Sequence, residues 1–392
     1  MNKFLNLIKQ FIKKPGGFFS LGIATFVANG IGGIFWLYIA SLLGTEEYGK
    51  VTYFISIAII ASTVSLVGMT NTMTVFRAKG EKIQSSIYLI GIISPLITSV
   101  ILFFIFLQNI EISLYVIGFV TFTLIGAELI GLKSFNKYGK LIISQKILLV
   151  TLSIGLYHII GYEGIILGMA ISFLPFITII IKTFKQEKIN FEILKTKYKF
   201  IVNSYLLDLV SAFNGSFDKI IIVPILGFAL LGNYQLGIQF LTLLGILPGI
   251  FYQYILPHDS SGDSTKSIKK IMILVSIVIS IGSIILTPTV IPKIFPDFTE
   301  AVVLIQIMSI SVVSSTIISI YTSKYLALEK SKIVIIGSGV YLLIQIPTLI
   351  ILTNYWGING VGFSVVIASI AHAIFFIIIS QLQNESKKEN KS

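Results

Sequence analysis

Long apolar stretches alternate with short polar stretches along the whole chain. Each apolar stretch approaches the roughly 20 helical residues that are needed to cross a bilayer core of about 30 Å. Helices are expected because backbone groups surrounded by lipid have to form their hydrogen bonds within the protein. The pattern predicts twelve spanning helices, at 17–43, 51–69, 85–107, 112–132, 141–160, 165–181, 200–226, 233–256, 271–291, 301–323, 333–352 and 358–380.

Basic residues gather in every second polar stretch, and this sets the predicted topology. With the N-terminus in the cytoplasm, 25 of the 29 Lys and Arg residues fall in cytoplasmic stretches. Only Lys50 and Lys293 fall in outer stretches, while Lys146 and Lys219 lie within predicted helices. Since positive residues are retained on the cytoplasmic side of membranes, we predict a multi-pass protein of the plasma or inner membrane with both termini cytoplasmic.

The composition agrees with a lipid environment and excludes several kinds of chemistry. Charged residues make up 12% of the chain, against about 25% in soluble proteins. The net charge of +12 is explained by the topology, so no nucleic-acid partner is expected. The absence of cysteine excludes disulfides and thiolate metal sites. The three histidines are far apart in the sequence, so we expect neither a metal site nor a cofactor.

Two glycine patterns occur once in each half of the chain. Leu43-Gly44, followed by Gly49, resembles Leu226-Gly227, followed by Gly232, at a distance of 183 residues. Gly161-Tyr-Glu-Gly164 resembles Gly357-Ile-Asn-Gly360 at a distance of 196 residues. The similar offsets indicate a duplication of six helices, and six is an even number, so the two copies are parallel repeats.

The duplication predicts the organisation of the domains. The first residues carry four lysines and apolar residues at helical spacing, which is typical of an amphipathic helix on the membrane surface. We therefore expect a cytoplasmic interfacial helix (1–16), an N-terminal six-helix bundle (17–181), a basic cytoplasmic linker (182–199), a C-terminal six-helix bundle (200–381) and a cytoplasmic tail (382–392).

Two motifs give the chain a resemblance to a known family. The first is Leu42-Leu-Gly-Thr-Glu-Glu-Tyr-Gly-Lys-Val, after the first predicted helix. The second is Phe217-Asp218-Lys219-Ile220-Ile-Ile, followed by Leu226-Gly227 and Leu231-Gly232-Asn-Tyr234. Together they resemble the polysaccharide (O-antigen-type) flippases of the MATE-like MOP superfamily, which are polysaccharide biosynthesis proteins.

The resemblance implies a MATE-like fold and a transport function. It implies a flippase that moves a polyprenyl-linked oligosaccharide across the cell membrane by alternating access, for surface polysaccharide or glycan biosynthesis. Its expected partners are this substrate, membrane lipids and, in a coupled mechanism, a cation. We expect a monomer that has no enzymatic activity.

Charged residues inside predicted helices are candidates for the transport site. Each costs about 2.5–3.5 kcal/mol to insert into a membrane and usually faces a cavity. The seventh predicted helix carries a polar stripe at helical spacing, formed by Ser204, Asp208, Ser211 and Asp218. The other candidates are Glu128, Lys146 and Lys219.

Each candidate also has an interpretation without a transport role. In the functional one, Asp208 and Asp218 bind a coupling cation or substrate hydroxyls, and Lys146 and Lys219 attract the lipid pyrophosphate. In the other, Lys219 forms a salt bridge with an acidic neighbour, and Lys146 extends to the lipid headgroups.

Three alternative functions remain open at this point. A cation-coupled multidrug exporter of the same fold and a lipid II-like flippase would both share the predicted architecture. A membrane-embedded glycosyltransferase or polymerase usually needs a sizeable outer loop. The longest predicted outer stretch is 292–300, and no Asp-x-Asp motif flanks a predicted helix, which disfavours the enzymes.

Overall fold

The computed structural model describes residues 17–105, 109–261 and 265–389, and all their regular elements are helical. The interfacial helix predicted for residues 1–16 lies outside the described residues. The elements are α2 (Gly17–Leu66), α3 (Met69–Ala78), α4 (Gln84–Ile105), α5 (Ile110–Gly131), α6 (Phe135–Ile160), α7 (Glu163–Ile171), η1 (Leu174–Phe176), α8 (Ile177–Gln186), α9 (Phe191–Thr196), α10 (Tyr198–Leu244), α11 (Ile246–Ser260), α12 (Lys266–Ile294), α13 (Ala301–Ser309), α14 (Ser311–Ala327) and α15 (Ser331–Glu389).

The described helices account for the twelve predicted spans. Nine of them, counting continuous helical stretches, are long and apolar enough to cross a membrane. Three of the nine, α2, α10 and α15, contain a glycine with non-helical backbone angles. α2 and α15 each cover two predicted spans, whereas α10 covers the seventh and the first part of the eighth, which α11 continues. The protein is therefore an all-α multi-pass membrane protein, as the hydropathy pattern predicted.

The chain divides into two compact units. Met1–Tyr38 and Phe54–Ser216 form the first unit, and Ile39–Tyr53 and Phe217–Ser392 form the second. The boundaries fall inside α2 and α10, because each of these helices contributes to both units. The predicted division into two six-helix bundles joined by a linker at 182–199 stays a prediction.

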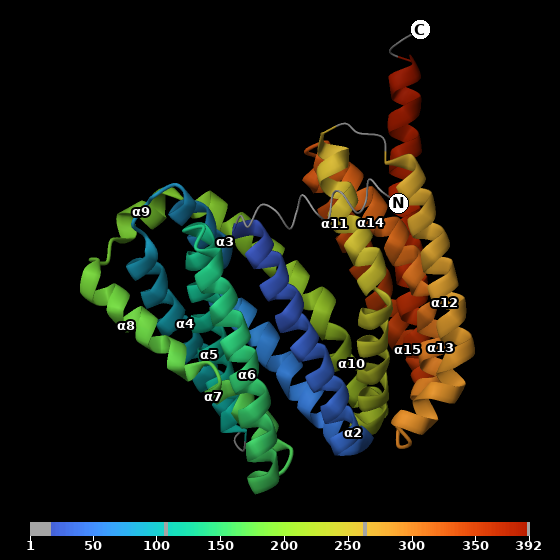
Figure 1. Ribbon diagram of the computed structural model, residues 1–392, viewed down its shortest axis with the longest axis horizontal. Helices are drawn as coiled ribbons and strands as arrows, with labels where there is room; N and C mark the ends of the chain where they lie inside the picture. Colours follow the sequence, from blue (N-terminus) through green and yellow to red (C-terminus); the bar gives the residue numbers. More distant parts are fainter. Residues whose placement is uncertain (1–16, 106–108, 262–264, 390–392) are drawn as a thin grey trace. The chain divides into compact units, whose positions relative to one another are not determined.

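In the first unit, α5 is the central helix. It packs against α3, α4, α6 and α7, and α4, α5 and α6 run side by side in Figure 1. One apolar core lies between α3, α4 and α5 and includes Met73, Ile87, Tyr88 and Leu124, all fully buried. This core fixes α3 and α5, which carry many of the side chains described below.

The predicted basic linker folds onto this first unit. The Ser85 hydroxyl donates to the Glu187 carbonyl (3.0 Å), and Ser86 exchanges two hydrogen bonds of 2.8 Å with the backbone of Asn190. The Asn190 side chain then accepts from the Glu192 amide and caps α9. α9 is consequently held at the beginning of α4, where both views show it.

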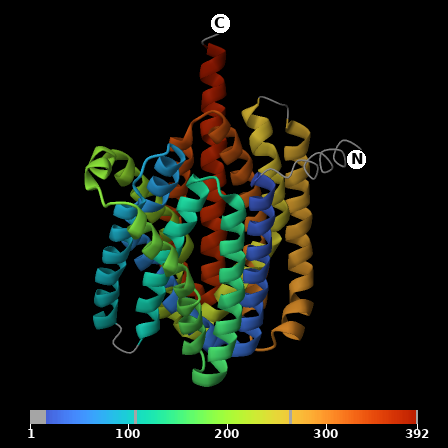
Figure 2. The same ribbon diagram turned by 60° about the vertical axis from the view of Figure 1, so that its left-hand side comes forward.

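In the second unit, α14 packs against α11, α12 and α15. The apolar core of the second unit includes Tyr234, Leu304, Met308 and Leu349. The last turns of α15 (red) continue beyond α14 in Figures 1 and 2, past residue 380, where the last predicted span ends.

The glycine of the repeated Leu-Gly pattern adopts a similar backbone conformation in both copies. Gly44 (φ 67°, ψ −176°) and Gly227 (φ 81°, ψ 178°) share a backbone region that is essentially restricted to glycine. Each glycine breaks its long helix where the sequence predicts the outer end of a span. The second repeat behaves alike, because Gly161 and Gly357 also have positive φ.

The glycine five positions further on allows backbone contact within the second unit. A β-carbon added to Gly49 would lie 1.9 Å from the Phe228 carbonyl oxygen. One added to Gly232 would lie 2.0 Å from the Thr45 carbonyl oxygen. The two helix starts therefore meet at two glycines, as small residues permit in membrane proteins.

We predict that Gly49→Ala and Gly232→Ala each destabilise the protein. The added methyl group would clash with a backbone oxygen, which cannot rotate away as a side chain can. The loss in free energy of unfolding should therefore reach about 3 kcal/mol, the upper part of the usual range for overpacking. The measurement is the thermal unfolding midpoint of the purified protein in detergent. Gly30→Ala and Gly33→Ala are matched controls in α2, because nothing lies within 4 Å of their added β-carbons. Equal midpoints for both pairs would contradict this packing.

Asp259 joins three helices of the second unit near the predicted cytoplasmic side. Its carboxylate accepts hydrogen bonds from Thr265 (2.5 Å), Lys269 (2.7 Å) and Ser323 (2.7 Å). Burial on its own would raise the pKa of Asp259, but the hydrogen bonds from these three side chains and the Lys269 charge lower it overall. A carboxyl group with a lowered pKa stabilises the fold above its unfolded pKa, and this contribution is lost as the pH falls through the folded value.

We predict a pH-dependent difference between the wild type and Asp259→Asn. At pH 7 the variant should unfold about 3 °C lower, because its neutral amide binds Lys269 more weakly. As the pH falls below about 4, the usual pKa of aspartate, the difference should begin to shrink, and it should vanish only below the lowered pKa of the folded state, where the wild-type carboxylate is protonated. Thermal unfolding between pH 3 and pH 7 measures it. Asp297→Asn, at an exposed position, is the control that should show no such trend.

Candidate functional site

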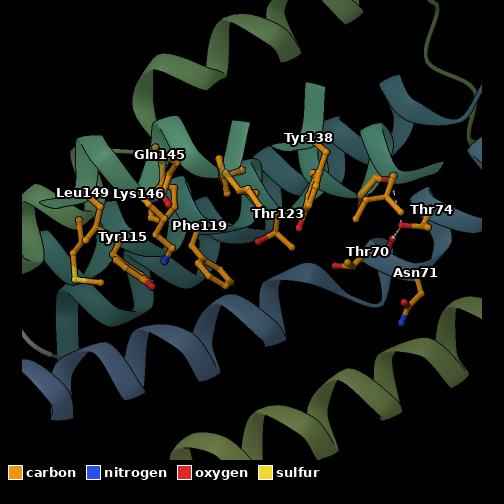
Figure 3. Close-up of a pocket in the computed structure, with 17 residues that line it drawn as sticks. Thr70, Asn71, Thr74, Tyr115, Phe119, Thr123, Tyr138, Gln145, Lys146 and Leu149 are labelled. Carbon is orange, nitrogen blue, oxygen red and sulfur yellow. Dashed lines mark hydrogen bonds between the residues drawn. The ribbon is translucent and has the colours of Figure 1, made fainter. Parts of the chain in front are cut away.

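A cavity of about 490 Å³ lies within the first unit. Its walls come from α3, α5 and α6, with Met169 of α7 and Phe173 just after that helix (Figure 3). The lining residues are Thr70, Asn71, Thr74, Tyr115, Phe119, Phe122, Thr123, Gly126, Ala127, Ile130, Tyr138, Ile142, Gln145, Lys146, Leu149, Met169 and Phe173. A concave site with many apolar and a few polar groups is the usual form of a small-ligand site.

Lys146 is the one charged side chain among these lining residues. Its amino group points into the cavity beside Tyr115 and Phe119 (Figure 3). A β-carbon added to Gly32 of α2 would lie 3.9 Å from the Lys146 Nζ, so α2 passes close by. Within the described residues no hydrogen bond or ion pair reaches this ammonium group. An anion in the cavity would therefore find a cation that is not already neutralised.

The position of Lys146 along α6 tests the alternative that its side chain extends to the lipid headgroups. α6 begins at Phe135, which places Lys146 about 16 Å along the helix axis at 1.5 Å per residue. The sequence expectation placed the start of this span at residue 141, much closer to Lys146. The longer helix and the cavity beside it favour a side chain that serves the cavity.

Aromatic rings form one wall of the cavity. Tyr115 and Phe119 are stacked with ring centroids 5.7 Å apart, and Phe173 meets both rings edge to face. The neutral polar lining groups include the hydroxyls of Thr70, Thr74, Thr123 and Tyr138 and the side-chain amides of Asn71 and Gln145. Together they offer apolar ring faces and neutral hydrogen-bonding groups around a single positive charge.

Asp208 reaches this cavity through Asn71. The Asn71 side-chain amide donates to the Asp208 Oδ1 at 3.3 Å, and Asn71 itself lines the cavity. The Asp208 Oδ2 is buried and has no hydrogen-bond partner among the described residues. A buried carboxylate oxygen without a donor is unfavourable, so this atom could accept a proton, water or cation.

The two serines of the predicted stripe lie in different surroundings on α10. Ser204 is buried, whereas Ser211 is exposed and donates to the Leu207 carbonyl at 2.9 Å. Neither serine lines the cavity.

Glu128 belongs to a separate polar cluster of the first unit. It accepts a hydrogen bond of 2.5 Å from the Tyr88 hydroxyl, and the Arg77 guanidinium lies 3.5 Å away. The residue is buried but does not line the cavity. These contacts hold α3, α4 and α5 together, so a role for Glu128 in transport stays a prediction.

Asp218 and Lys219 form an ion pair within the second unit. The Lys219 Nζ lies 3.3 Å from the Asp218 Oδ1, which also accepts from the Lys219 amide at 2.8 Å. The Tyr234 hydroxyl donates to the other Asp218 oxygen. This is the salt-bridge arrangement that the sequence left open for Lys219, and the transport role of both residues stays a prediction.

Sequence reasoning did not identify the polar wall of α3. Residues 70–84 were expected to be a cytoplasmic stretch, yet Met69–Ala78 is a helix whose Thr70, Asn71 and Thr74 line the cavity. The available signal was the spacing of Thr70 and Thr74, which places them on one helix face. Thr123, Tyr138 and Gln145 are uncharged and carried no comparable signal.

Solved structures of known transporters share the fold of this chain. A "Lipid II flippase MurJ, inward closed conformation" matches with a TM-score of 0.71 and 17% identity, over 92% of this chain and 87% of the other. An inward-facing multidrug resistance MATE family transporter of the MOP superfamily matches with a TM-score of 0.67 and 14% identity, over 96% and 100%. A mutant of the Vibrio cholerae MATE transporter VcmN matches with a TM-score of 0.59 and 15% identity, over 94% and 97%.

The comparisons establish the class of fold. No protein-family profile and no curated protein sequence matches the chain. The similarity in structure extends over nearly the whole chain, so the protein has the fold that these transporters share. This confirms the predicted multi-pass fold, and the O-antigen-type subfamily remains a hypothesis.

We predict that the cavity beside Lys146 is open to water. The chain has no cysteine, so single cysteines can be introduced without removing others. In membrane vesicles Thr123→Cys should react with a membrane-impermeant maleimide, because Figure 3 shows Thr123 facing the cavity. Ile147→Cys, on the exposed apolar side of α6, is the control and should react at least tenfold more slowly. Equal rates would contradict a hydrated cavity.

Proposed function

We propose that the protein is a flippase that moves a polyprenyl-linked oligosaccharide from the cytoplasmic to the outer leaflet by alternating access. In this proposal it serves surface polysaccharide or glycan biosynthesis, and no covalent bond of the substrate changes. The fold supports it, since one of the similar structures is named a lipid II flippase and others are MATE transporters. The motifs around Gly44 and Asp218 support the polysaccharide branch.

The observation that carries this proposal is the single ammonium group of Lys146 in an aromatic and hydroxyl-lined cavity. A lipid-linked sugar presents phosphate charges next to sugar rings. Lys146 would attract the phosphate as a point charge, while Tyr115 and Phe119 would contact the apolar faces of sugar rings. The threonine hydroxyls and the side-chain amides of Asn71 and Gln145 would hydrogen-bond to sugar hydroxyls.

The coupling cation, where one is used, is best assigned to Asp208. Its Oδ2 is buried without a partner in the described part of the chain, whereas Asp218 already accepts from Lys219 and Tyr234. Asn71 joins Asp208 to the cavity wall, so the occupancy of Asp208 would alter the cavity.

Asp208 also supports the second candidate function, a cation-coupled multidrug exporter. A carboxylate beside an aromatic cavity would attract a cationic drug. Lys146 opposes this function because its charge repels such a substrate within the same cavity. A lipid II-like flippase has the same chemistry as the main proposal and differs only in the glycan.

We predict that Lys146→Met abolishes transport, while Lys146→Arg retains a substantial part of it because the positive charge stays. The assay is complementation of a deletion strain, in which lipid-linked glycan should accumulate on the cytoplasmic leaflet and surface glycan should fall. Lys140→Met is the matched control, because Lys140 is exposed on the same helix.

Two results would contradict the proposal. Full complementation by Lys146→Met would remove the cavity lysine from the mechanism. Drug sensitivity of the deletion strain with normal surface glycan would instead identify a multidrug exporter.

A further inference from the structure

A second, shallower groove runs along α4 of the first unit. It has a volume of about 250 Å³ and is lined by Leu89, Ile90, Ile93, Ser94, Ile97, Thr98 and Phe191. All but Phe191 belong to α4, and the stretch from Leu89 to Thr98 is about 14 Å long. Ile93 and Ile97 are about half exposed, so the groove is open to the surroundings of a predicted spanning helix.

Phe191 closes the groove from outside α4 and is held firmly in place. It is the first residue of α9, and the loop before it is bound to α4 through Ser85 and Ser86. Leu194, one turn later, is buried in the core of the first unit. The groove is thus a built feature of two elements, at the end of α4 that the topology places at the cytoplasmic leaflet.

Two exposed lysines lie close to Phe191 in the sequence. Lys195 is four residues after Phe191, so both side chains extend from the same face of α9, and Lys188 lies three residues before it. Both lysines are exposed, and no ion pair of either is formed within the described residues. Glu192 follows Phe191 directly and is therefore turned about 100° away around the helix. An apolar groove next to positive charges matches a lipid with an anionic headgroup.

We propose that this groove binds an anionic phospholipid of the cytoplasmic leaflet. One acyl chain lies along α4 against Ile93 and Ile97, and the phosphate lies near Lys188 and Lys195. Anionic lipids are concentrated in the cytoplasmic leaflet and attract basic segments at its surface. Since α9 is part of the connection between the two predicted repeats, a bound lipid would fix this connection to the membrane surface.

The test uses phospholipids whose brominated acyl chains quench tryptophan fluorescence at short range. Phe191→Trp is made in a background in which both native tryptophans, Trp36 and Trp356, are replaced by phenylalanine, and the protein is reconstituted in nanodiscs. Half-maximal quenching should need at least a threefold lower mole fraction of brominated phosphatidylglycerol than of phosphatidylcholine with the same chains.

Matched variants separate the headgroup and acyl-chain parts of the site. Lys188→Gln with Lys195→Gln should reduce the threefold ratio to about one, while Lys137→Gln with Lys140→Gln, exposed on α6, should leave it unchanged. Ile97→Phe should weaken quenching by both lipids, whereas Ile101→Phe, exposed on α4 beyond the groove, should not. Each variant must keep the parental unfolding midpoint to be compared.

Three outcomes would overturn the proposal. Equal quenching by the two lipids would show that no anionic lipid is preferred, and an equal effect of both lysine pairs would show a general surface charge. Displacement of brominated phosphatidylglycerol by equimolar undecaprenyl phosphate, but not by unlabelled phosphatidylglycerol, would identify an isoprenoid site. Since quenching requires no transport, these outcomes are independent of whether the flippase proposal holds.

Discussion

The hydrocarbon solvent requires each polar group inside a span to find its partner within the protein, and most features of this structure follow from that. The backbone meets the requirement by forming helices. Buried charged side chains meet it in clusters, as Glu128 does with Tyr88 and Arg77, and Asp218 with Lys219 and Tyr234. Of the candidate residues named by the sequence, Lys146 and one oxygen of Asp208 do not meet it within the described residues. Both are connected with one cavity, which is why that cavity is the candidate transport site.

The same constraint explains the repeated glycines. A helix that ends at the membrane surface and returns immediately has to change direction within a few residues, since little polar chain is available for a loop. Gly44 and Gly227 do so with similar backbone angles, and Gly49 and Gly232 then allow direct contact of two backbones. The short Leu-Gly repeat in the sequence therefore corresponds to the same kind of turn in the structure. The two copies agree in backbone conformation as well as in sequence spacing.

The two proposed sites use one kind of chemistry at two depths of the first unit. In the cavity, a single lysine faces aromatic rings and hydroxyls, which suits a phosphate joined to sugars. In the groove of α4, lysines lie at the surface and the lining is aliphatic, which suits a phosphate joined to acyl chains. The difference between the two linings separates a candidate substrate site from a candidate lipid site.

The sequence by itself determined the class of fold, because hydropathy, the distribution of lysines and the glycine spacing each depend on local composition. It also named Lys146 and Asp208 as candidates, since a charge inside a span is conspicuous in one dimension. Only the tertiary structure could decide which charges are neutralised. Lys219 and Lys146 look alike in the sequence, yet Lys219 is paired with Asp218 whereas Lys146 faces a cavity. The uncharged wall formed by Asn71, Thr123 and Gln145 was likewise invisible, because contacts between α3, α5 and α6 depend on how the helices pack and not on any local pattern.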